Sequence, residues 1–182
     1  MSIVLMASGN GTNFEAIVKS GIPVSKVITN KKYAKVISRA KWLAIPCEVS
    51  EKNYEDCVPD DTKLVVLAGF MRLLSNEFVS KFKVINVHPS LLPSFPGVNA
   101  IGQALNAGVK ITGCTVHWVD EGIDTGKIIA QTSCDVYDDD DHKSLNNRIQ
   151  KLEYFLYPHT IKKLLEVEVN NEIMEDCKVV EE

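Results

Sequence analysis

Short apolar segments alternate with helical patterns along most of the chain. Leu64–Ala68 contains no polar residue, which is typical of a strand buried on both faces of a parallel sheet. Strands that alternate with helices in this way indicate an α/β fold with a largely parallel sheet. The predicted strands are Ile3–Ala7, Val24–Thr29, Pro46–Val49, Leu64–Ala68, Val84–Val87, Gly113–Val119 and Ile128–Cys134.

Helical spacing of apolar residues occurs between these strands. Four predicted helices are short: Asn13–Ser20, Tyr33–Leu43, Ser75–Phe82 and Val98–Ala107. The longest predicted helix, Asp141–Glu166, has an apolar stripe beside a polar one, both at a spacing of about 3.6 residues. The apolar stripe consists of Leu145, Ile149, Leu152 and Leu156, and the polar stripe of Asn146, Gln150, Glu153 and Tyr157.

The pattern changes near the end of the long helix. Pro158 is expected to kink or break it, because proline lacks the backbone N–H that a helix uses. The alternating segment 167–173 predicts a short C-terminal hairpin. Neither a repeat nor a flexible linker divides the sequence, so we expect residues 1–182 to form a single domain.

Composition and charge narrow the functional classes. The 182 residues are 45% hydrophobic and 24% charged, which is ordinary for a globular domain. The net charge of −4 argues against a broad nucleic-acid-binding surface but leaves room for a local phosphate pocket. Five dispersed cysteines without a C-x-x-C pair predict neither a disulfide framework nor a cysteine zinc site. Since the first residues also lack a signal-peptide pattern, we expect a cytoplasmic protein without a membrane partner.

A glycine-containing loop, Ser8–Asn13, joins the first predicted strand to the first predicted helix. In this geometry backbone N–H groups and the helix N-terminus hold an anion, and Thr12 or Asn13 offers side-chain donors. The loop matches neither the dinucleotide-binding G-x-G-x-x-G nor the NTP-binding G-x-x-x-x-G-K-[ST] pattern. It is therefore a candidate site for a single phosphate, and the alternative is a tight turn without a ligand.

Asn86 and His88 lie where the fifth predicted strand meets a proline-rich loop. Alternation along a strand places both side chains on one side, which combines an amide donor with a group that titrates near neutral pH. Ligands of open α/β sheets bind outside the carboxyl ends of the strands. The pair is thus a candidate catalytic site, and the alternative is a purely structural histidine beside a proline.

The segment 120–126 follows the sixth predicted strand and carries three acidic residues, of which Asp124 is the last. From the order of the strands we expect this turn at the same sheet edge as His88, where a carboxylate would favour the protonated imidazole. The alternative is an ordinary polar turn. His117, inside the strand, is expected to be buried and hydrogen-bonded, and the sequence shows no cluster of metal ligands.

Four motifs stand in order along the chain: S-G-N-G-T-N at 8–13, L-A-G-F-M-R-L-L at 67–74, I-N-V-H-P-S-L-L-P-S-F-P-G at 85–97 and G-C-T-V-H-W-V-D-E-G-I-D-T-G at 113–126. Together they resemble the phosphoribosylglycinamide formyltransferase family of folate-dependent enzymes. The resemblance implies a Rossmann-like fold with a cis peptide bond at Leu92–Pro93. It also implies metal-free transfer of the formyl group of 10-formyltetrahydrofolate to the amine of glycinamide ribonucleotide in purine biosynthesis, through a tetrahedral intermediate.

The same resemblance implies roles for individual residues. The catalytic group would be Asn86, His88 and Asp124. The substrate would contact Gly11, Thr12 and Asn13 with its phosphate, and Gln150 and Glu153 on the side of its amine. The folate would contact Met71, Arg72, Leu73, Leu74 and Asn86, with the backbone of Asp120, Glu121, Gly122, Ile123 and Asp124 around the pterin.

The chain departs from the family pattern at two places. Between Val49 and Leu64 the family has a longer helix with an arginine that approaches both ligands, whereas this chain has a short segment with Lys52. Lys127 stands where the family commonly has a proline, directly after the implied catalytic loop.

Other protein classes share part of the pattern. Methionyl-tRNA and sugar-nucleotide formyltransferases have the same Asn, His and Asp set but carry a further C-terminal domain, and a tRNA substrate needs a basic surface. Formyltetrahydrofolate hydrolases have an extra N-terminal domain. A non-catalytic phosphate- or nucleotide-binding module would not need Asn86, His88 and Asp124. We therefore expect a monomeric or homodimeric enzyme that acts on small molecules.

Overall fold

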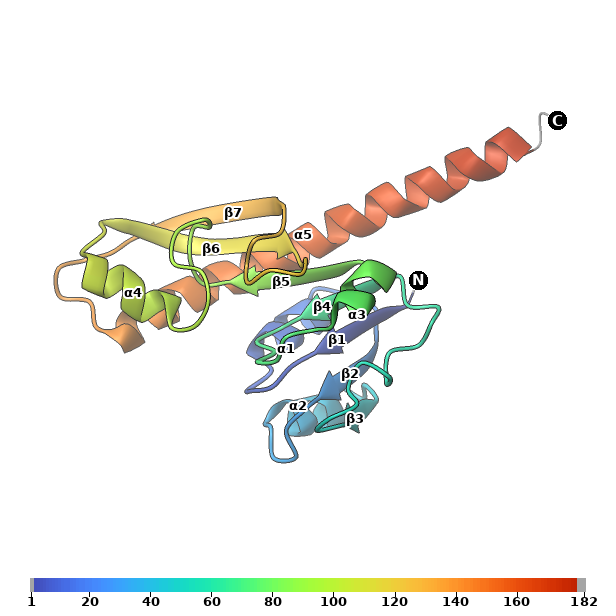
Figure 1. The fold of residues 1–182 in the computed structure, drawn as a ribbon, viewed down its shortest axis with the longest axis horizontal. Helices are drawn as coiled ribbons and strands as arrows, with labels where there is room; N and C mark the ends of the chain where they lie inside the picture. The colour runs from blue at the N-terminus through green and yellow to red at the C-terminus, as the bar shows by residue number, and fades with distance from the viewer. Residues whose placement is uncertain (1, 180–182) are drawn as a thin grey trace.

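Within residues 2–179, seven strands form one sheet: β1 (Ile3–Met6), β2 (Val24–Thr29), β3 (Cys47–Val49), β4 (Leu64–Leu67), β5 (Val84–His88), β6 (Ile111–Trp118) and β7 (Ile128–Asp135). The computed structural model describes the backbone of residues 2–179 and the side chains of residues 2–167. Across the sheet the strand order is β3-β2-β1-β4-β5-β6-β7. Strands β1 to β5 are parallel, and β6 and β7 add antiparallel strands at one edge (Figure 1).

All seven predicted strands are present, each with both ends within two residues of the predicted ones. The central strands β1 and β4 are buried along their whole length, which explains why their sequences contain apolar residues only. The predicted α/β, Rossmann-like fold with a mostly parallel sheet is confirmed. The cis peptide bond at Leu92–Pro93 is present as well.

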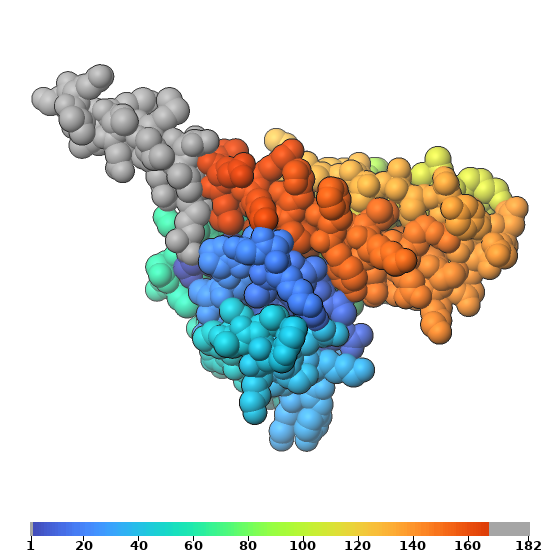
Figure 2. Space-filling model, turned by 180° about the vertical axis from the view of Figure 1, so that it is seen from behind, coloured from blue at the N-terminus to red at the C-terminus, as the bar shows by residue number. Residues whose placement is uncertain are grey.

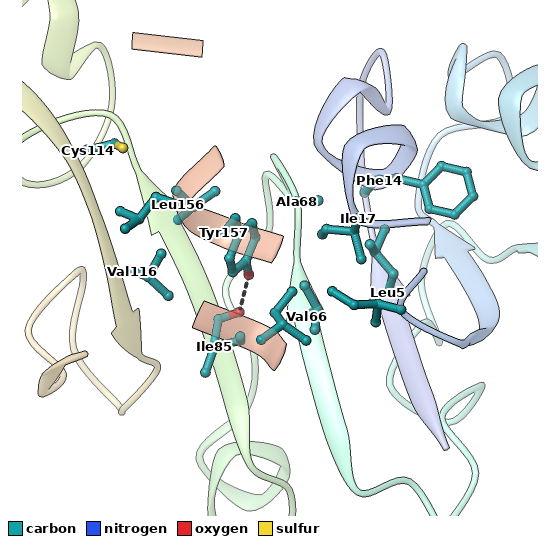
Figure 3. Close-up of a cluster of buried hydrophobic side chains, with 14 of the residues drawn as sticks. Leu5, Phe14, Ile17, Val66, Ala68, Ile85, Cys114, Val116, Leu156 and Tyr157 are labelled. Carbon is teal, nitrogen blue, oxygen red and sulfur yellow. Dashed lines mark hydrogen bonds between the residues drawn. The ribbon is translucent and has the colours of Figure 1, made fainter. Parts of the chain in front are cut away.

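In the described part of the chain, five helices cover the sheet: α1 (Thr12–Lys19), α2 (Val36–Trp42), α3 (Asn76–Lys81), α4 (Ala100–Ala107) and α5 (His142–Val179). Apolar residues of α1, α2, α4 and α5 share one core with one face of the sheet, part of which is drawn in Figure 3. The other face packs against α3 and the segment 54–58. The two hydrophobic cores cover much of both sheet faces. Polar side chains that could form a functional site must therefore lie at the margins of these cores.

Helix α5 is longer than predicted and corrects the expectation for residues 167–173. Its start is capped by Asp141, whose Oδ1 accepts a hydrogen bond from the Ser144 N–H at 2.7 Å. Pro158 lies inside the helix without ending it. The hairpin predicted at 167–173 is wrong, because this backbone continues α5 beyond the sheet (Figure 1). A lone two-stranded hairpin is marginally stable, whereas a helix that is already packed gains one hydrogen bond per added residue.

The Tyr157 side chain fixes α5 to the middle of the sheet. It is fully buried, and its hydroxyl lies 2.9 Å from the Leu67 carbonyl oxygen and 3.0 Å from the Ile85 carbonyl oxygen. One phenol therefore bonds the last residue of β4 and the second residue of β5, and Figure 3 draws the bond to Ile85. The residue after Ile85 is Asn86, so this contact also supports the backbone of a candidate site residue.

We predict that Tyr157→Phe lowers the free energy of unfolding by about 1–3 kcal/mol, because two buried carbonyl groups lose a donor. Urea denaturation followed by circular dichroism measures this change. The matched control is Tyr33→Phe, whose ring is 87% exposed and which should leave the stability unchanged. An equal, near-zero effect of the two substitutions would contradict the anchoring role of the Tyr157 hydroxyl.

Candidate active site

Asn86 and His88 lie on the sheet face opposite to the core that contains Ile85 and Val87. The alternation predicted from the sequence is therefore confirmed. His88 is 5% exposed, and Asn86 is half-buried. Both side chains are held on β5, one of the strands that Tyr157 supports.

The turn 120–126 reaches His88 by a route that the sequence did not predict. Because β6 is antiparallel to β5, its last residue, Trp118, pairs with Ile85 near the start of β5. The turn therefore begins at the sheet edge opposite to His88, and the expectation of a shared edge is wrong. The loop instead folds back, which brings Asp124 against His88.

The Asp124 carboxylate joins three segments of the chain. Its Oδ2 accepts a hydrogen bond from the Gly97 N–H at 2.8 Å and lies 3.2 Å from Nδ1 of His88. Its Oδ1 lies 3.5 Å from Nε2 of His117. The Asp124 backbone has φ 55°, in the left-handed region that few non-glycine residues occupy. The loop thus adopts an uncommon backbone conformation while its carboxylate bonds inward.

The partners of Asp124 hold it in the ionised form. Burial works to raise the pKa of its carboxyl, but the hydrogen bonds from His117 and Gly97 and the charges of His88 and His117 outweigh burial. The pKa of Asp124 therefore lies below its usual value. A carboxylate at neutral pH in this position stabilises positive charge on a neighbouring imidazole.

Both ring nitrogens of His88 face hydrogen-bond acceptors. Nδ1 faces the Asp124 carboxylate, and Nε2 lies 2.8 Å from the Phe95 carbonyl oxygen. A carbonyl or an ionised carboxylate can only accept, so this geometry suits an imidazolium with a proton on each nitrogen. Asp124 and the Phe95 carbonyl thus fix the orientation of the His88 ring.

His117 also belongs to this group, which sequence reasoning missed. Its Nδ1 lies 2.9 Å from the Trp118 carbonyl oxygen, while Nε2 lies 3.4 Å from Nδ2 of Asn86. The expected burial is confirmed at 2% exposure. Its place opposite Asn86 follows from the antiparallel register of β5 and β6, and only knowledge of that register could have revealed it.

The phosphate-binding candidate, Ser8–Asn13, forms the connection between β1 and α1. Gly11 is the N-cap of α1 with φ 73°, and a Cβ at this position would lie 2.7 Å from Cγ2 of Val36. Only glycine fits both the backbone conformation and the available space. The loop therefore presents backbone N–H groups next to the start of a helix.

Asn13 and Glu153 come together although 140 residues separate them, with Nδ2 of Asn13 donating to Oε2 of Glu153 at 2.9 Å. Burial raises the pKa of Glu153 to about 7, against the lowering effect of the Asn13 hydrogen bond. Oδ1 of Asn13 is buried without a hydrogen-bond partner in the structure. Gln150, one turn earlier on α5, is bonded to the Tyr154 hydroxyl at 3.3 Å. Two predicted substrate groups thus meet at one place.

The predicted folate-binding segment, 71–74, lies on the surface. Met71 and Leu73 are 68% and 73% exposed, whereas Leu74 packs against a core. The segment is held by its backbone, because the Met71 N–H donates to Oγ of Ser8 at 2.8 Å and the Leu73 carbonyl accepts from the Tyr54 hydroxyl at 3.1 Å. Large apolar groups on a rigid exposed backbone suit the binding of a flat, partly apolar ligand.

The turn 120–126 is shaped by its own side chains. Oδ1 of Asp120 accepts hydrogen bonds from the Gly122 N–H at 3.1 Å and from the Thr125 hydroxyl at 2.7 Å. Glu121 and Gly122 are exposed, and so is Ile123. A pocket of about 250 Å³ adjoins the turn, lined by Leu92, Pro93, Pro96, Ile123, Asp124, Thr125, Gly126 and Ile128.

The segment 50–63 forms turns, and Lys52 is exposed in it.

Among the side chains that the structure describes, no group of three or more His, Cys, Asp or Glu could hold a metal ion. Cys47, Cys57, Cys114 and Cys134 have free thiols. Within the described residues no helix is long and apolar enough to cross a membrane.

Comparison with known proteins assigns this geometry to a family. A family model described as formyl transferase matches residues 1–161. The chain belongs to the formyl transferase family. Phosphoribosylglycinamide formyltransferase of Bacillus subtilis is 43% identical to it, over 88% of this chain and 93% of that protein.

Further relatives within the formyl transferase family agree in sequence and in structure. The crystal structure of phosphoribosylglycinamide formyltransferase from Bacillus halodurans has a TM-score of 0.85 and 41% identity, over 91% of this chain and 95% of that one. The human trifunctional purine biosynthetic protein adenosine-3 is 37% identical over 88% of this chain, which spans only 18% of that longer protein. This chain thus shares its fold with the Bacillus halodurans structure, and most of its length aligns with both proteins.

We predict that Glu153 makes the stability of this formyl transferase depend on pH. Between about pH 4.5 and about pH 7 the folded protein keeps a proton on Glu153 that the unfolded chain has lost. Stability should therefore fall as pH rises through this window, by roughly 1 kcal/mol per pH unit. Glu153→Gln should remove this slope in urea denaturation across the window, while Glu166→Gln, an exposed position on the same helix, should retain it. An unchanged slope in Glu153→Gln would contradict the raised pKa.

Proposed function

We propose that this protein transfers the formyl group of 10-formyltetrahydrofolate to the amine of glycinamide ribonucleotide, a step of purine (IMP) biosynthesis. The observation that carries the proposal is the half-buried Asp124 carboxylate, which lies 3.2 Å from Nδ1 of His88, a residue on the same strand face as Asn86. Relatives that match nearly the whole chain are named for this activity. We assign Asn86, His88 and Asp124 as the catalytic residues.

The chemistry that these residues suit is acyl transfer. The substrate amine attacks the formyl carbon, a C–N bond forms, and negative charge develops on the formyl oxygen. The bond from the formyl carbon to the folate nitrogen then breaks, and the proton lost by the amine ends on that nitrogen. His88 supplies an acidic proton to these reaction steps, and Asp124 keeps the imidazole ring charged and oriented.

The developing oxyanion needs donors that are already in place. The amide of Asn86 and the imidazolium of His88 provide them from one rigid strand, and such donors typically contribute about 10²–10³-fold to the rate. Without substrate, Nε2 of His88 is hydrogen-bonded to the Phe95 carbonyl. In the reaction His88 exchanges one of its two acceptors for the formyl oxygen.

The two ligands would occupy different parts of the site. The substrate phosphate binds the N–H groups of Gly11, Thr12 and Asn13, and the amine-bearing part lies near Gln150 and Glu153. The contact between Asn13 and Glu153 supports this assignment, because it makes the loop and α5 two walls of one region. The folate covers Met71, Arg72, Leu73 and Leu74, with its pterin near Asn86 and the backbone of 120–124.

We also propose that residues 1–182 act as a single catalytic domain in the cytoplasm, as a monomer or homodimer. Both reactants are small molecules, so the reaction itself requires neither a nucleic acid nor a membrane. The proposed steps use only side chains and backbone groups of this chain, and we propose that no metal takes part.

The direct test is an assay of the purified protein with 10-formyltetrahydrofolate and glycinamide ribonucleotide, with initiator methionyl-tRNA and an amino sugar nucleotide as alternative acceptors. We expect product from glycinamide ribonucleotide alone, and unchanged rates after addition of a chelator. His88→Ala should lower kcat about 10²–10⁴-fold, because it removes the acid and one oxyanion donor. Asn86→Ala and Asp124→Ala should also lower kcat, and the three losses should not add, since the residues act as a unit.

His159→Ala serves as the control, because this exposed histidine stacks on Phe155 and should leave kcat unchanged. Near-normal turnover of a folded His88→Ala protein would refute the assigned mechanism. Transfer to another acceptor in place of glycinamide ribonucleotide would refute the assigned substrate.

A further inference from the structure

Helix α2 donates hydrogen bonds to two carbonyl groups of the loop Ser8–Asn13. The Gly9 carbonyl accepts a hydrogen bond from the Val36 N–H at 3.1 Å. The Asn10 carbonyl accepts one from Nε of Arg39 at 2.7 Å. In the space-filling view of Figure 2, the blue N-terminal part of the molecule adjoins the orange-red residues of α5.

These two contacts decide which way the loop N–H groups point. In a planar trans peptide the C=O and the following N–H point in opposite directions. When α2 holds the carbonyls of Gly9 and Asn10, the N–H groups of Asn10 and Gly11 are turned away from α2. Gly11 is left-handed, and successive N–H groups around such a residue form a concave anion-binding site.

Arg39 also removes a charge conflict at this place. Glu15 lies in the first turn of α1, close to the loop where a phosphate would bind. Arg39 forms an ion pair with Glu15 through Nη1, and Lys19 pairs with the same carboxylate at 2.6 Å. Two cations thus surround one carboxylate, which leaves a net positive charge beside the loop and favours an anion there.

We infer that Arg39 is a positioning residue for the substrate phosphate. Arg39 acts on the phosphate through the loop, because it fixes the Asn10–Gly11 peptide and compensates the negative charge of Glu15. Only a guanidinium can bond the carbonyl through Nε and the carboxylate through Nη1 at once, since lysine offers a single nitrogen. The inference rests on the proposed function in one respect, namely that the substrate carries a phosphate that binds this loop.

The test compares Arg39→Lys, which keeps the charge but loses the fork, with Lys41→Gln, which loses an exposed charge on the same helix. We expect Arg39→Lys to raise KM for glycinamide ribonucleotide about tenfold, the effect of one lost charge-assisted hydrogen bond. KM for the folate, kcat and the melting temperature should change little. Lys41→Gln should match the wild type.

The deciding measurement repeats the kinetics with the dephosphorylated acceptor, glycinamide ribonucleoside. The variant and the wild type should then have the same KM, because the group that Arg39 serves is absent. An equal rise in KM with both acceptors, or a rise in KM for the folate, would overturn the inference.

Calorimetric titration with ribose 5-phosphate separates this inference from the proposed function, because it requires no turnover. Weaker binding to Arg39→Lys than to the wild type supports the inference even if glycinamide ribonucleotide is not formylated. Equal binding, or none to the wild type, overturns it. As a second variant, Glu15→Gln should tighten ribose 5-phosphate binding, since it removes the negative charge beside the loop, and weaker binding would contradict the charge argument.

Discussion

A carboxylate that is withdrawn from water must find donors, and Asp124 finds them on three segments that are distant in sequence. The Gly97 N–H comes from the proline-rich loop, His88 from the end of β5, and His117 from β6. Each partner loses its own interaction if the loop 120–126 moves away. The hydrogen bond from Gly97 and the contacts with His88 and His117 therefore hold the loop folded back over the sheet, and the arrangement of the site depends on them.

The part of the site formed by Asn13 and Glu153 depends on α5, the last helix in the described part of the chain. Its place on the sheet is set by the Tyr157 hydroxyl, which bonds carbonyls of β4 and β5. Figure 3 shows the bond to β5. Glu153 lies one helical turn before Tyr157 and is thereby held against Asn13 of α1. The same helix thus supports the strand that carries Asn86 and closes the region where the substrate is proposed to bind.

Local patterns were sufficient to predict most of the fold. Short, mainly apolar segments predicted all seven strands, and alternation along β5 placed Asn86 and His88 on one face. What could not be predicted depends on pairing between distant segments. The antiparallel direction of β6 decides where the loop with Asp124 begins, and it places His117 opposite Asn86. The sequence of β6 alone is compatible with either direction.

The same limit applies to the end of the chain and to the second substrate group. The alternation in 167–173 suits a strand, but a strand needs a neighbour, and the continuing helix does not. The polar stripe of α5 was visible in the sequence, yet its partner Asn13 lies 140 residues away. The packing of α5 on the sheet and on α1, to which Tyr157 contributes, determines which polar residue of the stripe meets the loop.

The two carboxyl groups of the site show how packing gives one functional group two different properties. Asp124 is surrounded by donors from His117, Gly97 and His88, and these lower its pKa in spite of burial. Glu153 has a single donor, Asn13, and burial raises its pKa to about 7. Near neutral pH, Asp124 is therefore a fixed negative charge beside His88, whereas Glu153 can either hold or release a proton. Environments that separate the pKa values of two carboxyl groups in this way are typical of sites that move protons. Formyl transfer requires such a movement, because one proton passes from the amine to the folate nitrogen.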